Sequence, residues 1–274
     1  MTPSRTIETV VRRDRMIVIG GLAAVVVIAW IYILTGAGMG MSLFDMTSTP
    51  TMSVTPGGGT AMSVMQPMAW TMGTAVLMFF MWWIMMIAMM LPSAAPMILL
   101  FATVNRKGAE RGNAYVPTGV FAAGYLAMWG AFSMIATALQ WGLERTGLLS
   151  SMMASTSLVL GGVLLIAAGA WQLTPLKQAC LKHCRSPLHF ITHRWRKGRL
   201  GALRMGFEHG AYCLGCCWFL MGLLFYGGVM NLYWIAGLAL FVLLEKTIPA
   251  GHWLGRVTGG GLLGWGCYMM VLAL

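Results

Sequence analysis

Long runs of apolar residues, separated by short polar or basic segments, dominate this chain of 274 residues. A helix needs about 20 apolar residues to cross the roughly 30 Å hydrocarbon core of a bilayer. By this measure the sequence predicts spans near 16–36, 70–103, 116–141, 152–174, 203–227, 232–249 and 257–274. The expected fold is therefore an all-α, polytopic membrane bundle of about seven transmembrane helices.

These spans divide the chain into four segments. A basic tail at 1–15 precedes a first span at 16–36, and a polar, Met-rich outer loop at 37–69 follows it. The remaining residues, 70–274, form a membrane domain with six spans and a long basic inner connection at 176–202. No small-residue cleavage site follows the first apolar run, so we expect this span to remain as an anchor.

Composition and charge support membrane insertion and predict its orientation. Hydrophobic residues make up 58% of the chain and charged residues 9%, whereas soluble domains average about 25% charged residues. The formal net charge is +11 at pH 7, and every Lys and Arg except Arg145 falls on one side of the predicted topology. By the positive-inside rule this side, which includes the N-terminus, is cytoplasmic. The charge therefore faces anionic lipid, and we expect no nucleic-acid partner.

Cysteine and histidine residues gather where the fifth predicted span begins. Cys213 lies four residues after His209, and Cys216 and Cys217 lie three and four residues after Cys213. One helical face can therefore carry all four side chains. Thiolates and imidazoles bind soft or borderline ions such as Cu(I) and Zn²⁺. Glu208 lies at the edge of this face, where a carboxylate can orient an imidazole ligand. The pattern predicts a metal site.

The cytoplasmic end of the fourth predicted span adds a second set of ligands. Cys180, His183 and Cys184 share a face if the helix continues past Pro175. Stable disulfides are rare on the reducing, cytoplasmic side, so we expect free thiols. Together the two sets hold more donor atoms than one tetrahedral ion requires. This number of donors is compatible with two metal sites or with a relay that transfers the ion between them.

Other candidate residues have simpler interpretations. Cys267 lies far from the cluster and is interpreted as a small packing residue. Glu245 and Lys246 are expected to form an ion pair at the end of the sixth span. His189 and His193 stand among basic and aromatic residues and indicate a helix at the membrane surface.

Methionine is unusually frequent, with 26 residues in the chain, and it is concentrated in the outer loop and the second span. Four methionines of that span align at helical spacing: Met78, Met81, Met85 and Met89. Thioethers are neutral soft ligands that suit Cu(I), so this stripe is a candidate Met pathway. Methionine also fills apolar cores, and both interpretations stay open. Pro92 and Pro96 predict a kink or break in the same span.

The chain resembles a family of bacterial integral membrane proteins that are described as metal-binding and in places as copper chaperones. Three stretches carry the resemblance: residues 81–96, MWWIMMIAMMLPSAAP; residues 171–184, WQLTPLKQACLKHC; and residues 208–218, EHGAYCLGCCW. It covers about 70–274 and leaves out the outer loop. The resemblance implies a multi-pass protein of the bacterial cytoplasmic (inner) membrane that handles a metal.

The expected function is copper handling, with Cu(I) held by the Cys/His cluster and with Met residues assisting capture or transfer. Trafficking is expected rather than catalysis, because the P-loop, HExxH, CxxCH and GxSxG patterns are absent from the sequence. The expected partners are the lipid bilayer and subunits of a membrane complex or a copper-requiring enzyme. Zinc or haem remain alternative cofactors, and a haem- or iron-containing electron-transfer or oxidase subunit is an alternative function. A metal-free accessory subunit is another.

Overall fold

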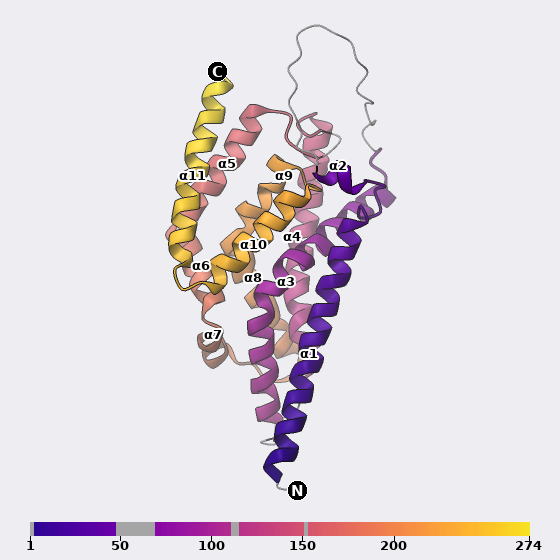
Figure 1. Cartoon of the computed structure of the whole chain (residues 1–274), viewed down its shortest axis with the longest axis vertical. Helices are drawn as coiled ribbons and strands as arrows, with labels where there is room; N and C mark the ends of the chain where they lie inside the picture. Colours follow the sequence, from indigo (N-terminus) through magenta and orange to yellow (C-terminus); the bar gives the residue numbers. More distant parts are fainter. Residues whose placement is uncertain (1–2, 48–68, 111–114, 151–152) are drawn as a thin grey trace.

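The computed structural model describes residues 3–47, 69–110, 115–150 and 153–274 (Figure 1). Apart from one isolated β-bridge between Leu149 and Ser155, the regular structure within these ranges is helical, as expected. The helices are α1 (Pro3–Leu34), α2 (Leu43–Thr47), α3 (Met72–Glu110), α4 (Thr118–Arg145), α5 (Leu158–Leu173), α6 (Pro175–Arg185), α7 (Pro187–Arg194), α8 (Gly198–Gly222), α9 (Leu224–Gly227), α10 (Leu232–Thr247) and α11 (Gly251–Leu272). Most of the expected outer loop, at 48–68, lies outside the described residues.

Four helical segments are long and apolar enough to cross a membrane. They are Arg15–Leu34, Met72–Ala109, Thr118–Arg145 and Gly198–Gly227. Helices α5 and α6 form a fifth candidate, which is broken and bent by 65°. Helix α10 has 16 residues and is about 24 Å long at 1.5 Å per residue. Helix α11 is rich in glycine. Neither helix is among the candidate spans. The described residues thus give four or five candidate spans, where the sequence predicted about seven.

Proline has different effects in α3, where a kink or break was predicted, and at Pro175. Helix α3 continues through Pro92 and Pro96 without interruption. Helix α5, in contrast, ends before Thr174, whose side chain accepts a hydrogen bond from the Lys177 backbone N–H and caps the start of α6. Pro175 is the first residue of α6, a position where the missing N–H costs no helical hydrogen bond. The resulting bend directs α6 against α8.

Glycine permits close helix packing at two crossings. A Cβ atom on Gly124 of α4 would clash with the backbone at Leu203 of α8, and one on Gly206 of α8 with the backbone at Phe121. A similar approach joins α5 and α11, where Gly169 faces the Gly259 backbone. Small residues are how helices approach each other in lipid, where the hydrophobic effect between helices is weak.

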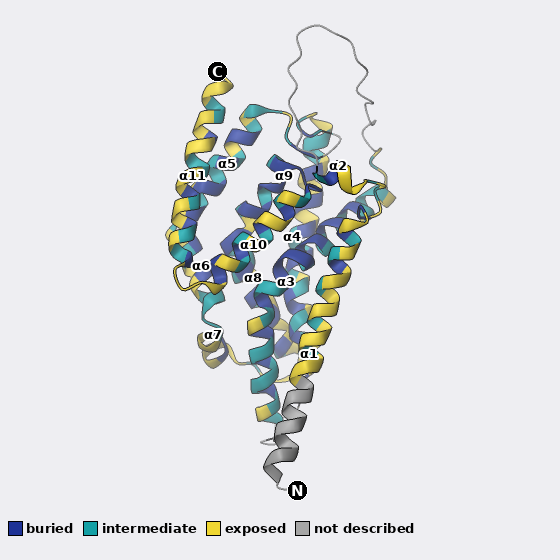
Figure 2. Cartoon of the chain, in the orientation of Figure 1, coloured by how far each residue is buried: buried dark blue, intermediate teal, exposed yellow. Residues whose placement is uncertain are grey.

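The helices form a bundle whose interior is rich in methionine. Helix α1 packs on α3, α3 on α4, and α4 on α8, while α5 and α11 pair at one side (Figure 1). Met78, Met81, Met85 and Met89 are all at most 3% exposed, so the predicted stripe faces inward (Figure 2). Helix α1 begins at one end of the long axis, and α11 ends at the other.

Candidate metal centre

Four cysteine thiols from two helices meet inside the bundle. Cys213, Cys216 and Cys217 of α8 are at most 1% exposed. Cys184 of α6 is half-buried, and its thiol interacts with those of Cys213 and Cys216. All six cysteines are free thiols in the structure. The bend at Pro175 thus brings an α6 thiol to the cysteine face of α8.

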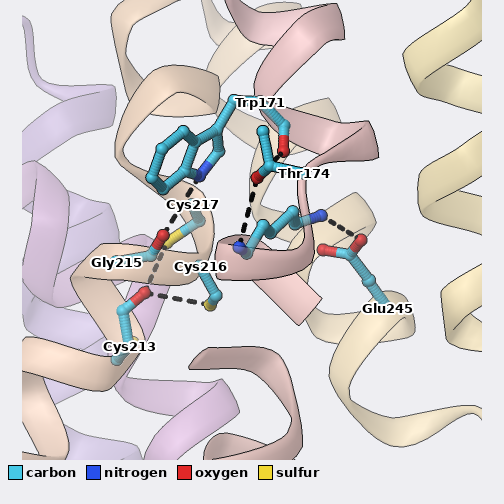
Figure 3. Close-up of polar contacts among 8 residues, drawn as sticks. Trp171, Thr174, Cys213, Gly215, Cys216, Cys217 and Glu245 are labelled. Carbon is cyan, nitrogen blue, oxygen red and sulfur yellow. Dashed lines mark hydrogen bonds and ion pairs between the residues drawn. The ribbon is translucent and has the colours of Figure 1, made fainter. Parts of the chain in front are cut away.

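The thiols on α8 point partly toward their own helix. Cys216 Sγ donates to the Cys213 carbonyl oxygen at 3.0 Å, and Cys217 Sγ donates to the same oxygen at 3.1 Å (Figure 3). Cys217 Sγ also lies 3.9 Å from the Met90 thioether of α3. Cys213 stands fifteen residues after the start of α8 and nine before its end, deeper than the helix end where we expected the cluster.

A buried ammonium group lies against the cluster, and the sequence did not reveal it. Lys246 of α10 is 8% exposed, and its Nζ donates to Cys213 Sγ at 2.9 Å and to Ser93 Oγ at 3.1 Å. The Tyr125 hydroxyl lies 3.1 Å from the same sulfur and donates to the Met90 carbonyl at 3.2 Å. The Cys213 sulfur therefore faces a positive charge and a hydroxyl inside the core.

The predicted ion pair between Glu245 and Lys246 was wrong. Glu245 pairs instead with Lys177 of α6, and both side chains are 0% exposed (Figure 3). The physical reason is helical geometry, since successive residues project about 100° apart at 3.6 residues per turn. Glu245 consequently faces α6, while Lys246 faces the thiols of α8.

His209 is the imidazole that joins the cluster. It is 3% exposed, lies one helical turn before Cys213, and has its ring 5.8 Å from that of Tyr125 and 5.6 Å from that of Phe190. Its Nδ1 is buried and makes no hydrogen bond with any described residue. Since a buried polar atom without a partner costs free energy, this nitrogen is suited to bind a ligand.

Three predicted ligands lie at the margin of the site or outside it. The Cys180 sulfur lies over Gly215, where an added Cβ would come within 2.9 Å of it. The His183 ring stacks on Tyr212 with centroids 4.3 Å apart. Glu208 does not orient His209. Its carboxylate instead forms ion pairs with Arg196, Arg204 and Arg194, at 3.0, 3.2 and 3.7 Å.

Three residues that the sequence analysis left out of the metal site also lie apart from the thiol cluster. His189 and His193 are exposed and stack on each other on α7, with centroids 4.2 Å apart. Cys267 is exposed on α11. These positions agree with the expectation that none of the three residues belongs to the cluster.

In the part of the chain that the structure describes, no three His, Cys, Asp or Glu side chains are already arranged to hold a metal ion. The hydrogen bonds above explain this, because two thiols turn to a carbonyl and a third sulfur contacts Lys246. The thiols are neighbours, but their sulfur atoms do not converge on one point.

Comparison with known proteins gives one match. A family model described as PpoB2, copper chaperone, matches residues 79–269. The matched range includes the Met-rich part of α3, all four thiols of the cluster, His209 and Lys246. No curated protein and no solved structure matches the chain.

Proposed function

Because this chain belongs to the PpoB2 copper chaperone family, we propose that it is a membrane protein that binds Cu(I) at the thiol cluster of α6 and α8. One observation carries this proposal above the others: thiols from two separate helices lie close enough to interact, beside an imidazole whose Nδ1 has no hydrogen-bond partner among the described residues. Thiolate and imidazole donors select soft ions, and Cu(I) is the softest ion considered for this site.

The proposed ligands are drawn from Cys184, Cys213, Cys217 and His209, with Cys180 and Cys216 as alternates. Rotation of Cys217 about its Cα–Cβ bond, from one staggered rotamer to another, frees its sulfur from the Cys213 carbonyl without moving α8. His183 and Glu208 stay outside the ligand set, because they are held by Tyr212 and by three arginines.

Lys246 supplies the charge balance that such a site requires. Two thiolates and one Cu(I) ion carry a net charge of −1, and an uncompensated charge is costly in a low-dielectric interior. The Lys246 ammonium already lies 2.9 Å from Cys213 Sγ, so it neutralises the complex without entering the ligand sphere.

The topology proposed for this function keeps the N-terminus cytoplasmic in a bacterial inner membrane, with α5–α6, α10 and α11 completing about seven crossings. Support comes from the basic residues near the end of the bundle where α1 begins. Arg106 and Lys107 lie in the last part of α3, and Arg199 and Arg204 in the first part of α8. Positive residues favour the cytoplasmic side. The buried Met stripe of α3 then runs between the outer end and the cluster.

Copper counting on purified protein tests the proposal. Protein in detergent is equilibrated anaerobically with Cu(I) against a competing chelator, and bound copper is measured by elemental analysis. We expect the variant Cys213→Ser/Cys217→Ser to lose the copper that the cluster holds, while Cys267→Ser, which changes an exposed cysteine, keeps the wild-type content. Thermal unfolding of each variant checks that it is folded. Undiminished copper in the folded double variant would rule out the assignment.

A further inference from the structure

A second group of soft and acidic side chains surrounds Gln140, at the end of the bundle opposite the start of α1. The Gln140 Nε2 atom lies 2.8 Å from Glu144 Oε1, 2.9 Å from Met153 Sδ and 3.5 Å from Met78 Sδ. These residues come from the last turns of α4, from the connection between α4 and α5, and from the start of α3. Two thioethers and a carboxylate therefore meet at one amide nitrogen.

The acceptors in this group outnumber the hydrogens available to them from Gln140. A primary amide carries two N–H hydrogens, whereas three acceptors surround Nε2. The indole of Trp82 donates to Gln140 Oε1 at 2.7 Å, which fixes the side of the amide that faces the sulfur atoms. At least one of Glu144, Met78 and Met153 thus receives no separate hydrogen from Gln140, and the three acceptors form an electron-rich cluster.

Gln140 and the two methionines are buried, Glu144 is half-buried, and the backbone of Met153 has an unusual conformation. Gln140 is 0% exposed, Met78 3% and Met153 6%. Met153 has a φ of 54°, in the left-handed region that costs a non-glycine residue about 1–2 kcal/mol. Its N–H donates to the Ser150 carbonyl at 2.8 Å, which secures the turn. Strained residues of this kind concentrate at functional sites.

We propose that Met78, Met153 and Glu144 form a second Cu(I) site, separate from the thiol cluster. Thioethers are neutral and prefer soft monovalent copper over hard cations. The single carboxylate cancels the charge of the ion, so the occupied site is neutral in an apolar environment. The Gln140 amide contacts all three proposed ligands, so binding of the ion requires this amide to turn aside.

The position of this site points to exchange of copper with the Met-rich outer loop. The Trp70 indole, which follows residues 48–68 in the sequence, donates to Glu144 Oε2 at 2.6 Å. Met65 and Met68 lie five and two residues before Trp70 in the sequence. This role in transfer rests on the proposed function, but ion binding by the three ligands does not.

Copper counting with paired variants separates the two sites. Full-length protein in detergent is titrated with Cu(I) under reducing conditions, and stoichiometry is measured for Met78→Leu/Met153→Leu, for Glu144→Gln and for the control Met134→Leu, an exposed methionine of α4. Leucine is close to methionine in volume, so the fold should be retained. We expect the double Met variant and Glu144→Gln each to lose one equivalent and the control to lose none.

The Cys213→Ser/Cys217→Ser variant distinguishes failure of this inference from failure of the proposed function. If it loses an equivalent and the Met variant does not, the second site is refuted and the thiol site stands. If only the Met variant loses copper, the thiol site is refuted and the second site stands. Indole fluorescence gives a further readout, since Trp70 and Trp82 bond to Glu144 and Gln140. Cu(I) should change it in the Cys213→Ser/Cys217→Ser variant and not when Glu144→Gln is added to that variant, which provides a test even if the double Met variant does not fold.

Discussion

The buried ion pair between Lys177 and Glu245 allows a quantitative test of the packing around the site. It joins α6 to α10, and both side chains are fully shielded from solvent. Glu245 Oε2 makes no hydrogen bond with a described residue, so Lys177 is the main compensation for the carboxylate charge. Removing the lysine alone leaves that charge buried.

The expected effect of Lys177→Met is large. Removing one partner of a buried pair costs about 3–5 kcal/mol. A change of 1 kcal/mol shifts Tm by about 2–4 °C in chains of 150–250 residues, so we expect Tm to fall by roughly 6–20 °C. The double variant Lys177→Met/Glu245→Leu removes both charges, and replacing a buried pair by apolar residues is often neutral or stabilising by about 1–4 kcal/mol. It should therefore recover most of the loss.

Thermal unfolding in detergent, followed by circular dichroism, measures both variants. Lys182→Met is the matched control, because Lys182 is an exposed lysine of the same helix and its loss should leave Tm unchanged. A Tm for Lys177→Met within about 3 °C of wild type, less than the shift expected for 2 kcal/mol, would refute the reasoning. So would a double variant that unfolds as early as the single one.

Two further predictions concern helix packing and pH. Gly206→Leu places a side chain against the Phe121 backbone of α4, and overpacking of this kind costs about 1–3 kcal/mol or more. We therefore expect a lower Tm in detergent. An unchanged Tm would contradict the close crossing of α4 and α8. The pKa of Asp45 lies below its ordinary value because the hydroxyl and backbone N–H of Ser42 donate to its carboxylate. The stability from these bonds is therefore present above the ordinary pKa and lost as pH falls through the lowered one, and Ser42→Ala should raise the pKa of Asp45 in an NMR titration.

Local properties of the sequence predicted much of the fold. Length and apolar content identified the spans in α1, α3, α4 and α8, because these quantities do not depend on neighbours. The spacing of Cys213, Cys216 and Cys217 placed their side chains on one side of α8. Both sets of cysteines were expected to serve one metal-binding region, and the thiol of Cys184 lies close enough to those of α8 to interact with them.

The remaining features depend on how distant helices cross. Nothing in the order of Glu245 and Lys246 reveals that one faces α6 and the other α8, since this follows from the rotation of α10. Glu208 was expected to orient His209, but it pairs with Arg204 one turn earlier on α8 and with Arg194 and Arg196, which precede that helix. The count of about seven spans stays a prediction, because α10 has only 16 residues and the 65° bend makes α5 and α6 one broken candidate beside four continuous ones.

Gly255 of α11 lies over the Lys177–Glu245 pair so closely that an added Cβ would come within 2.5 Å of Glu245 Oε1. Helix α11 is synthesised after both charged residues, so the pair gains this backbone cover only once the last helix has packed against it. We expect a chain that ends before residue 251 to be less stable than the full chain, because the two buried charges would lack this cover.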